Sequence, residues 1–208
     1  MYLPSHFQET RVDVMHDLMR AHPLATLVTF GGDGIIANHI PMVLHTDASE
    51  HGVLRGHVAR PNPFWKNLDP SVEALAVFQG PHHFITPTWY PSKQENGKVV
   101  PTWNYAVVHA HGPLIIIDDA DWLLEQVNSL TSEHESARDR PWAVSDAPAN
   151  YIEAMLKGII GLELPINHLD GKWKVSQNRD RKDREGVAQG LKQEGTASSI
   201  QMAELIGR

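Results

Sequence analysis

The spacing of apolar residues predicts one amphipathic helix followed by a series of strands. Within residues 10–23, Val12, Met15 and Leu18 recur at helical spacing and share one face. Four apolar segments that predict strands follow, at residues 24–30, 34–45, 53–59 and 72–80. Short turns join them, whereas a parallel sheet needs a helix between successive strands. The pattern therefore favours an antiparallel, mainly β fold.

The second half of the chain predicts further strands with helices at the periphery. Residues 81–101 hold four prolines and predict a long loop, and residues 102–117 predict one long strand. Helical spacing returns within residues 118–135 and 147–158, and a hairpin with its turn at Asp170 and Gly171 follows. The predicted organisation is a small antiparallel barrel over residues 1–178, a helical insertion at about 119–157, and a helical tail over 179–208 packed on the barrel.

Composition narrows the classes of protein that remain. The 208 residues include no cysteine, which excludes disulfides, thiolate metal sites and cysteine nucleophiles. No run of about 18 apolar residues occurs, and the first residues lack the pattern of a signal peptide, so a cytoplasmic protein is expected. The formal net charge of -7 disfavours indiscriminate binding to nucleic acid.

Two histidines two positions apart raise the question of a metal site. In a strand, His109 and His111 lie on the same face, as a pair of metal ligands requires. A metal site needs three or four ligands, and the nearest carboxylates in sequence, Asp118 and Asp119, follow the apolar end of the strand. No metal is therefore predicted.

The segment "GHVARPNP", residues 56–63, is a candidate phosphate site. A strand ends there and turns at a proline into a helix start, which combines unpaired backbone N–H groups with His57, Arg60 and Asn62. In the alternative reading, Arg60 is a surface arginine and Asn62 caps the helix.

A second polar set lies in "KVSQN", where Lys174, Ser176 and Gln177 place many hydrogen-bonding groups in a short stretch. It suits the polar edge of a ligand. The alternative is a strand end followed by a helix cap.

Several blocks together resemble one known family. They are "GHVARPNP", "VFQGPHHFITPTWYPSK", "VVPTWNYAVVHAHG", "LTSEHE", "IIGLELPI" and "KVSQNR". They look like the signature of the PaiB-type FMN-binding negative transcriptional regulators, with Thr86 and Thr88 where serines are expected. The resemblance covers almost the whole chain, and "PTWNY" and "K-x-SQN" are its most specific parts.

The resemblance implies an FMN-binding split β-barrel, normally a homodimer with flavin in the cleft between subunits. By analogy with similar flavoproteins, His57, Arg60 and Asn62 would hold the phosphate. The isoalloxazine would lie along the strand segment formed by Asn38, His39, Ile40 and Pro41. The motif positions Trp103, Asn104, Lys174, Ser176 and Gln177 are carried over as further candidate cofactor contacts.

The expected function is that of a flavin-binding regulator or a flavin-dependent redox protein, in which the flavin carries any redox step. Two alternatives stay open. One is a repressor that contacts DNA directly, although no helix-turn-helix with a basic recognition helix is readable. The other is a split-barrel protein that binds or degrades haem.

Overall fold

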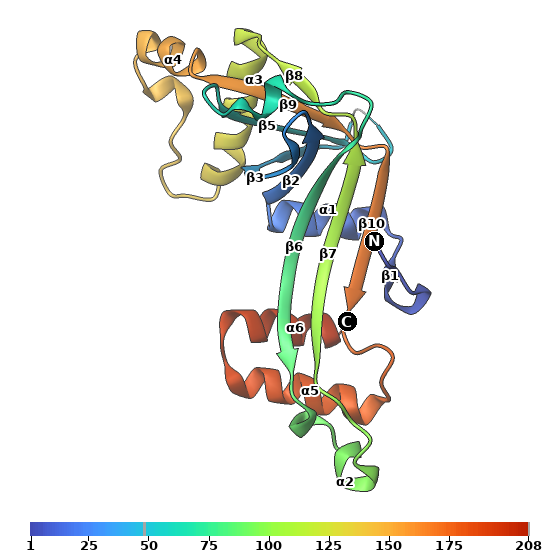
Figure 1. The fold of residues 1–208 in the computed structure, drawn as a ribbon. Helices are drawn as coiled ribbons and strands as arrows, with labels where there is room; N and C mark the ends of the chain where they lie inside the picture. The colour runs from blue at the N-terminus through green and yellow to red at the C-terminus, as the bar shows by residue number, and fades with distance from the viewer. Residues whose placement is uncertain (48, 208) are drawn as a thin grey trace. The chain divides into compact units, whose positions relative to one another are not determined.

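The computed structural model describes residues 1–47 and 49–207 (Figure 1). Its strands are β1 (Gln8–Glu9), β2 (Leu24–Gly31), β3 (Gly34–Pro41), β4 (Val43–His45), β5 (Val53–Ala59), β6 (Ala74–Ile85), β7 (Thr102–Gly112), β8 (Ile115–Ile117), β9 (Ile159–Pro165) and β10 (His168–Lys174). Its α-helices are α1 (Val12–Ala21), α2 (Ser92–Asn96), α3 (Ala120–Glu135), α4 (Ala149–Leu156), α5 (Arg181–Glu194) and α6 (Ala197–Gly207). Short 3-10 helices are η1 (Ser5–Phe7), η2 (Pro63–Lys66), η3 (Pro87–Trp89) and η4 (Val144–Asp146). Arg208, the end of the predicted helical tail, lies outside the described residues.

The chain divides into two compact units that interleave along the sequence. Unit 1 contains Met1–Leu18, Gln79–Val108 and Asp170–Arg208, and unit 2 contains Met19–Phe78 and His109–Leu169. Strands β6, β7 and β10 each belong in part to both units. Each unit therefore has its own core and its own candidate residues.

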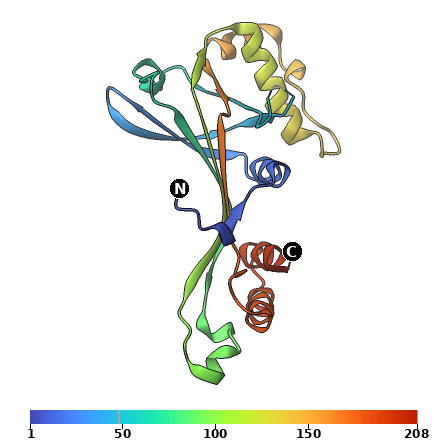
Figure 2. The same ribbon diagram turned by 90° about the vertical axis from the view of Figure 1, so that its right-hand side faces the viewer.

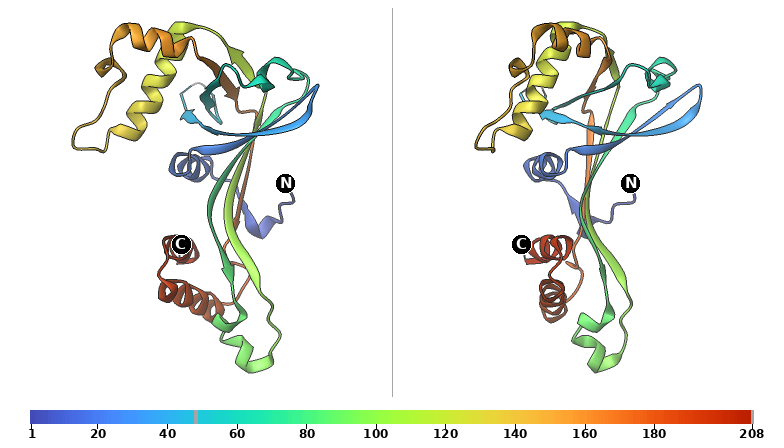
Figure 3. Two further views of the ribbon diagram at one scale, coloured as in Figure 1. Left: turned by 60° about the vertical axis from the view of Figure 1, so that its left-hand side comes forward. Right: turned by 90° about the vertical axis from the view of Figure 1, so that its left-hand side faces the viewer.

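Unit 2 holds the antiparallel strands that the first apolar segments predict. Strand β2 pairs with β3 and β6, and a second sheet has the order β4-β5-β9-β8. Helix α3 lies against β5 and β9 (Figure 3). The Asp119 carboxylate caps this helix by accepting from the Trp122 backbone N–H at 2.8 Å. Gly161 lets the Trp122 ring approach the sheet, because a Cβ there would lie 2.4 Å from a ring carbon.

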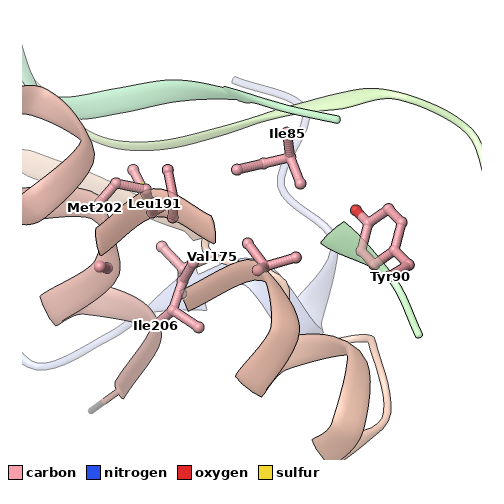
Figure 4. Close-up of a cluster of buried hydrophobic side chains, with 8 residues drawn as sticks. Ile85, Tyr90, Val175, Leu191, Met202 and Ile206 are labelled. Atoms are coloured by element: carbon pink, nitrogen blue, oxygen red, sulfur yellow. The ribbon is translucent and has the colours of Figure 1, made fainter. Parts of the chain in front are cut away.

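Unit 1 is a sheet covered on one side by the helical hairpin of the C-terminal tail. Its strand order is β1-β10-β7-β6, and helices α5 and α6 lie together on one side of these strands (Figure 2). Asp180 caps α5 by accepting from the Asp183 backbone N–H, and Gly195 ends it in the left-handed conformation at φ 71°. A buried apolar cluster joins the helices to the sheet (Figure 4): Ile85, Tyr90, Val175, Val187, Leu191, Met202, Ala203 and Ile206.

The segment between β6 and β7 is fixed to helix α5 by close packing and by one buried carboxylate. Gly190 admits the Trp89 indole, because a Cβ there would lie 2.4 Å from the ring. The Asp183 carboxylate, only 3% exposed, accepts from the Ser92 backbone N–H at 3.0 Å and from the Ser92 hydroxyl at 2.6 Å. These contacts give an aromatic, proline-rich segment a defined place in unit 1.

Three predicted element boundaries were wrong. The strand predicted over 34–45 splits at Met42 into β3, which pairs with β2, and β4, which pairs with β5. The predicted loop begins late, because β6 continues through Pro81 to Ile85. Strand β6 pairs with β2 only as far as Val77. Pro81 lies beyond that point, so its missing N–H costs no hydrogen bond between β6 and β2. The strand predicted over 102–117 stops at Gly112 and resumes at Ile115, because Pro113 interrupts it.

The hairpin predicted around Asp170 and Gly171 was also wrong. Both residues lie inside β10, and the chain turns between Pro165 and His168 instead. Strand β9 pairs with β5 and β8, whereas β10 pairs with β1. Gly171 is required by close approach rather than by a turn, because a Cβ there would lie 2.7 Å from the Met15 sulfur and 2.9 Å from the Glu9 carbonyl oxygen.

Among the described residues, no helix is both long and apolar enough to cross a membrane.

Candidate functional site

A hollow of about 440 Å³ in unit 2 collects half of the predicted cofactor residues. It lies where β3 faces the end of β5 and the start of β9. The predicted residues that line it are Asn38, His39, Ile40, Pro41, His57 and Asn62. Two segments chosen separately from the sequence, one for the ring and one for the phosphate, are thus brought to one place by the fold.

A chain of hydrogen bonds fixes the orientation of Asn38 in this hollow. The Phe64 backbone N–H donates to Asn62 Oδ1 at 3.3 Å, so Asn62 is the cap of η2. Its Nδ2 is then the donor to Asn38 Oδ1 at 2.9 Å. Asn38 Nδ2 is therefore the last donor of this series of hydrogen bonds. It is buried and has no partner within the described part of the chain. A buried donor of this kind costs about 1–3 kcal/mol unless an acceptor reaches it.

His57 is held from behind by a buried glutamine. His57 Nδ1 lies 2.7 Å from Oε1 of Gln126, which is 2% exposed on helix α3. With an acceptor at that distance, Nδ1 carries the proton, and the neutral ring is left with Nε2 as an acceptor. Protonation of the ring turns Nε2 into a second donor. Gln126 thus fixes the tautomer of the neutral His57 ring and leaves Nε2 as the nitrogen available to a ligand.

The Arg60 guanidinium is already paired with a carboxylate and with two backbone carbonyls. It makes a two-point contact with the Asp118 carboxylate at 2.8 and 2.6 Å, and it also donates to the carbonyls of Lys157 and Ile159. The Asp118 carboxylate raises the pKa of Arg60, and the guanidinium lowers the pKa of Asp118. Arg60 lines a different hollow, so a phosphate would have to compete with Asp118 for it.

The predicted residues of unit 1 gather at the end of β10. Asn104, 1% exposed, donates from Nδ2 to the Ser176 hydroxyl at 2.8 Å. Ser176 has φ 65°, the sole left-handed value among described residues other than glycine. Gln177 accepts from the Val175 backbone N–H at 2.8 Å and donates to the Trp173 carbonyl. These side chains hold a tight turn at the end of β10, as the alternative reading of "KVSQN" has it, but the cap of the following helix is Asp180 and lies beyond this stretch.

In this set, Trp103 and Lys174 are the residues whose side chains we consider for contact with a ligand. The Trp103 ring is 54% exposed and meets Phe84 edge-on, with ring centroids 6.0 Å apart. Lys174 Nζ donates to the Trp103 carbonyl at 2.7 Å and to the Thr102 hydroxyl. Burial, and then the charges of Lys172 and Arg179, lower the pKa of Lys174. An exposed indole can stack on a planar ligand, and Lys174 places a cation at the backbone of the same residue.

Two residues of the site were not predicted from the sequence. Asp118 was considered only as a metal ligand, and its contact with Arg60 joins positions 58 residues apart. Gln126 did leave a signal, because it shares the apolar face of its helix with Leu123 and Leu130. A polar side chain on such a face needs a buried partner.

Within the described residues, the histidine pair of β7 is not part of a larger group of metal-ligating side chains. The rings of His109 and His111 have centroids 6.3 Å apart. Across residues 1–47 and 49–207, no group of three or more histidine, aspartate or glutamate side chains is placed to hold a metal ion.

Comparison with solved structures identifies the fold. The structure of the FAD and heme binding protein from Mycobacterium smegmatis matches with a TM-score of 0.53 and 18% identity, over 88% of this chain and 80% of that one. The flavocytochrome Anf3 from Azotobacter vinelandii matches with a TM-score of 0.56 and 13% identity, over 80% of this chain and 69% of that one. Together with the antiparallel sheets, which do not close on themselves, these likenesses define a split β-barrel, as predicted.

Sequence comparison identifies the family. The chain belongs to the family described as "Putative FMN-binding domain", whose model matches residues 1–168. It is 32% identical to the Bacillus subtilis protein named Protease synthase and sporulation protein PAI 2, over 99% of this chain and 96% of that protein. The predicted PaiB-type resemblance is confirmed, and FMN is the cofactor that this membership assigns.

Proposed function

We propose that the chain holds FMN in the hollow between β3 and β5 and acts as a flavin-dependent redox protein or a flavin-responsive regulator. The observation that carries the location is Asn38 Nδ2, a buried donor whose orientation is fixed by Asn62 and which lacks an acceptor among the described residues. The carbonyl oxygens and ring nitrogens of a flavin edge supply acceptors of the kind this donor needs.

Each polar residue in or near the hollow has a separate role in the proposed binding of FMN. Asn38 donates to an acceptor of the ligand, and Asn62 keeps it in position from the cap of η2. His57 contributes a second donor when its ring is protonated, with Gln126 holding the other nitrogen. Arg60 joins the phosphate site only if the phosphate displaces Asp118 from the guanidinium. FMN itself supplies the electron-transfer chemistry when bound.

Within unit 1, Trp103 and Lys174 form a separate candidate set for ligand binding. The exposed indole offers a face for stacking, and the neighbouring ammonium offers a positive charge. Asn104, Ser176 and Gln177 act behind them by holding the turn after β10. The homodimer implied by the family resemblance is part of this proposal.

The regulator branch is favoured by one relative. The printed name of the Bacillus subtilis protein connects that protein with protease synthesis and sporulation. A regulator that contacts DNA directly remains the weaker branch, because a net charge of -7 opposes the phosphate backbone. A haem protein is an outcome that the optical spectrum distinguishes.

Two measurements test the proposal. Titration with FMN and with riboflavin, which lacks the phosphate, locates the phosphate contacts. His57→Ala is expected to weaken FMN more than riboflavin, and equal weakening of both ligands would contradict its role. Arg60→Ala is expected to have the same effect only if the phosphate displaces Asp118 from the guanidinium. Addition of NADPH to the FMN complex under anaerobic conditions then separates the branches. Bleaching of the flavin bands indicates a reductase, and unchanged bands favour the regulator branch.

A further inference from the structure

Another hollow, of about 370 Å³, lies entirely within unit 1. Its walls come from β1, α1, the end of β10 and the helices α5 and α6. Apolar surface comes from Val14, Trp173 and Leu205, and charge comes from Glu9, Arg11 and Arg184. The volume falls within the range of small-molecule sites, which begins at roughly 300 Å³.

Arg184 brings an unsatisfied guanidinium to this hollow. Its Nη2 donates to the Ile206 carbonyl at 3.0 Å, which ties α5 to the end of α6. Its Nε is buried and has no hydrogen-bond partner among the residues described. A guanidinium donates through a planar fork of N–H groups, and a carboxylate matches that fork. Nη2 of Arg184 is thus fixed by the Ile206 carbonyl, while the adjacent Nε is available to donate to an acceptor of a ligand.

The remaining charges of the hollow leave one positive charge uncompensated. Arg11 donates to the Glu9 carboxylate from Nε at 2.9 Å and from Nη2 at 2.6 Å. These bonds lower the pKa of Glu9, so this carboxylate stays ionised at neutral pH and balances Arg11. Arg184 has no acidic partner among the lining residues once Glu9 is occupied. The hollow is therefore suited to a ligand that carries a single negative charge.

The apolar walls specify the rest of such a ligand. Trp173 presents an aromatic side chain, and Val14 and Leu205 present aliphatic ones. Gln177 also lines the hollow, but its amide is committed to the backbone of the turn. An inorganic anion would leave this apolar surface wet, whereas a carboxylate with a hydrophobic body would cover it.

We propose that this hollow binds a small monocarboxylate with an aromatic or branched aliphatic body, whose carboxylate accepts from Arg184. The site is not the proposed flavin site, since it is built from residues of unit 1 alone. It would give a flavoprotein of this family a place for a small-molecule effector on the helices of its C-terminal tail. The proposal does not depend on where FMN binds.

Isothermal titration calorimetry of the full-length protein with benzoate and with benzamide tests the site. Benzamide has nearly the same shape without the charge, so benzoate is expected to bind at least roughly tenfold more tightly. Arg184→Gln is expected to remove this preference. Arg181→Gln is the matched control, because Arg181 lies on the same helix with its side chain 92% exposed and pairs with Glu185.

A second variant keeps the test informative if loss of the Ile206 contact disturbs the fold. Leu205→Phe leaves Arg184 in place and fills part of the hollow, and it is expected to weaken benzoate at least roughly tenfold. Absence of any benzoate binding to the unsubstituted protein would overturn the proposal. So would benzoate binding that survives both Arg184→Gln and Leu205→Phe.

Discussion

Replacement of Asn38 by leucine is the sharpest perturbation of the proposed flavin site. The side chain keeps nearly the same size but loses the buried Nδ2 donor that we assign to FMN. Pairing of such a donor is worth about 1–3 kcal/mol. Loss of that pairing corresponds to roughly a 5- to 150-fold increase in the Kd for FMN.

The same change is expected to leave the stability of the ligand-free protein nearly unaltered. Asn38→Leu removes one unpaired donor, Asn38 Nδ2, and creates another, because Asn62 Nδ2 loses its acceptor. The two effects offset each other, so the free energy of unfolding should change by no more than about 1 kcal/mol. Binding that weakens without loss of stability is the signature that distinguishes a ligand contact from a structural one.

Fluorescence titration with FMN and urea denaturation without it measure the two quantities. Asn128→Leu is the control, because the amide of Asn128 lies exposed on α3 and, among the described residues, donates to the Leu124 carbonyl of its own helix. Its Kd for FMN is expected to equal that of the unsubstituted protein. A Kd for Asn38→Leu within twofold of the unsubstituted protein would refute the reasoning about Asn38.

Three further substitutions probe other parts of the structure. Gln126→Leu removes the hydrogen bond to His57 and is expected to weaken FMN about 2- to 12-fold in the same titration; an unchanged Kd would show that Gln126 does not position the ring. Gly171→Ala places a Cβ against the Met15 sulfur and should lower the free energy of unfolding in urea by about 1–3 kcal/mol, whereas unchanged stability would contradict the close approach. The Tyr90 hydroxyl is buried and makes no hydrogen bond of standard geometry among the described residues, although the Arg179 guanidinium interacts with it. Tyr90→Phe should therefore change the free energy of unfolding in urea by no more than about 1 kcal/mol, and a larger loss would show a hydrogen bond to Arg179.

Local pattern was sufficient for much of the fold. The segment 53–59 is β5 residue for residue, and the proline turn after it is η2 with Asn62 as its cap. These features depend on alternation, proline geometry and capping, all of which act within a few residues. The sequence also directed attention to the two segments that meet in the hollow between β3 and β5.

Features that depend on distant partners were not predictable in this way. Asp170 and Gly171 read as a turn from local chemistry, but Gly171 is needed because helix α1 and strand β1 approach β10. Arg60 reads as a phosphate ligand, but its charge is met by Asp118. The unpaired Nδ2 of Asn38 can be identified only from the contact with Asn62, which fixes the orientation of the Asn38 amide. In each case the deciding neighbour lies far away in the sequence.

The absorption spectrum of the purified protein, recorded before and after addition of FMN and removal of the free ligand, tests the central claim most directly. The account predicts flavin bands that remain with the protein at about one FMN per chain. A protein that stays colourless after exposure to FMN, or that shows a haem band instead, would contradict it.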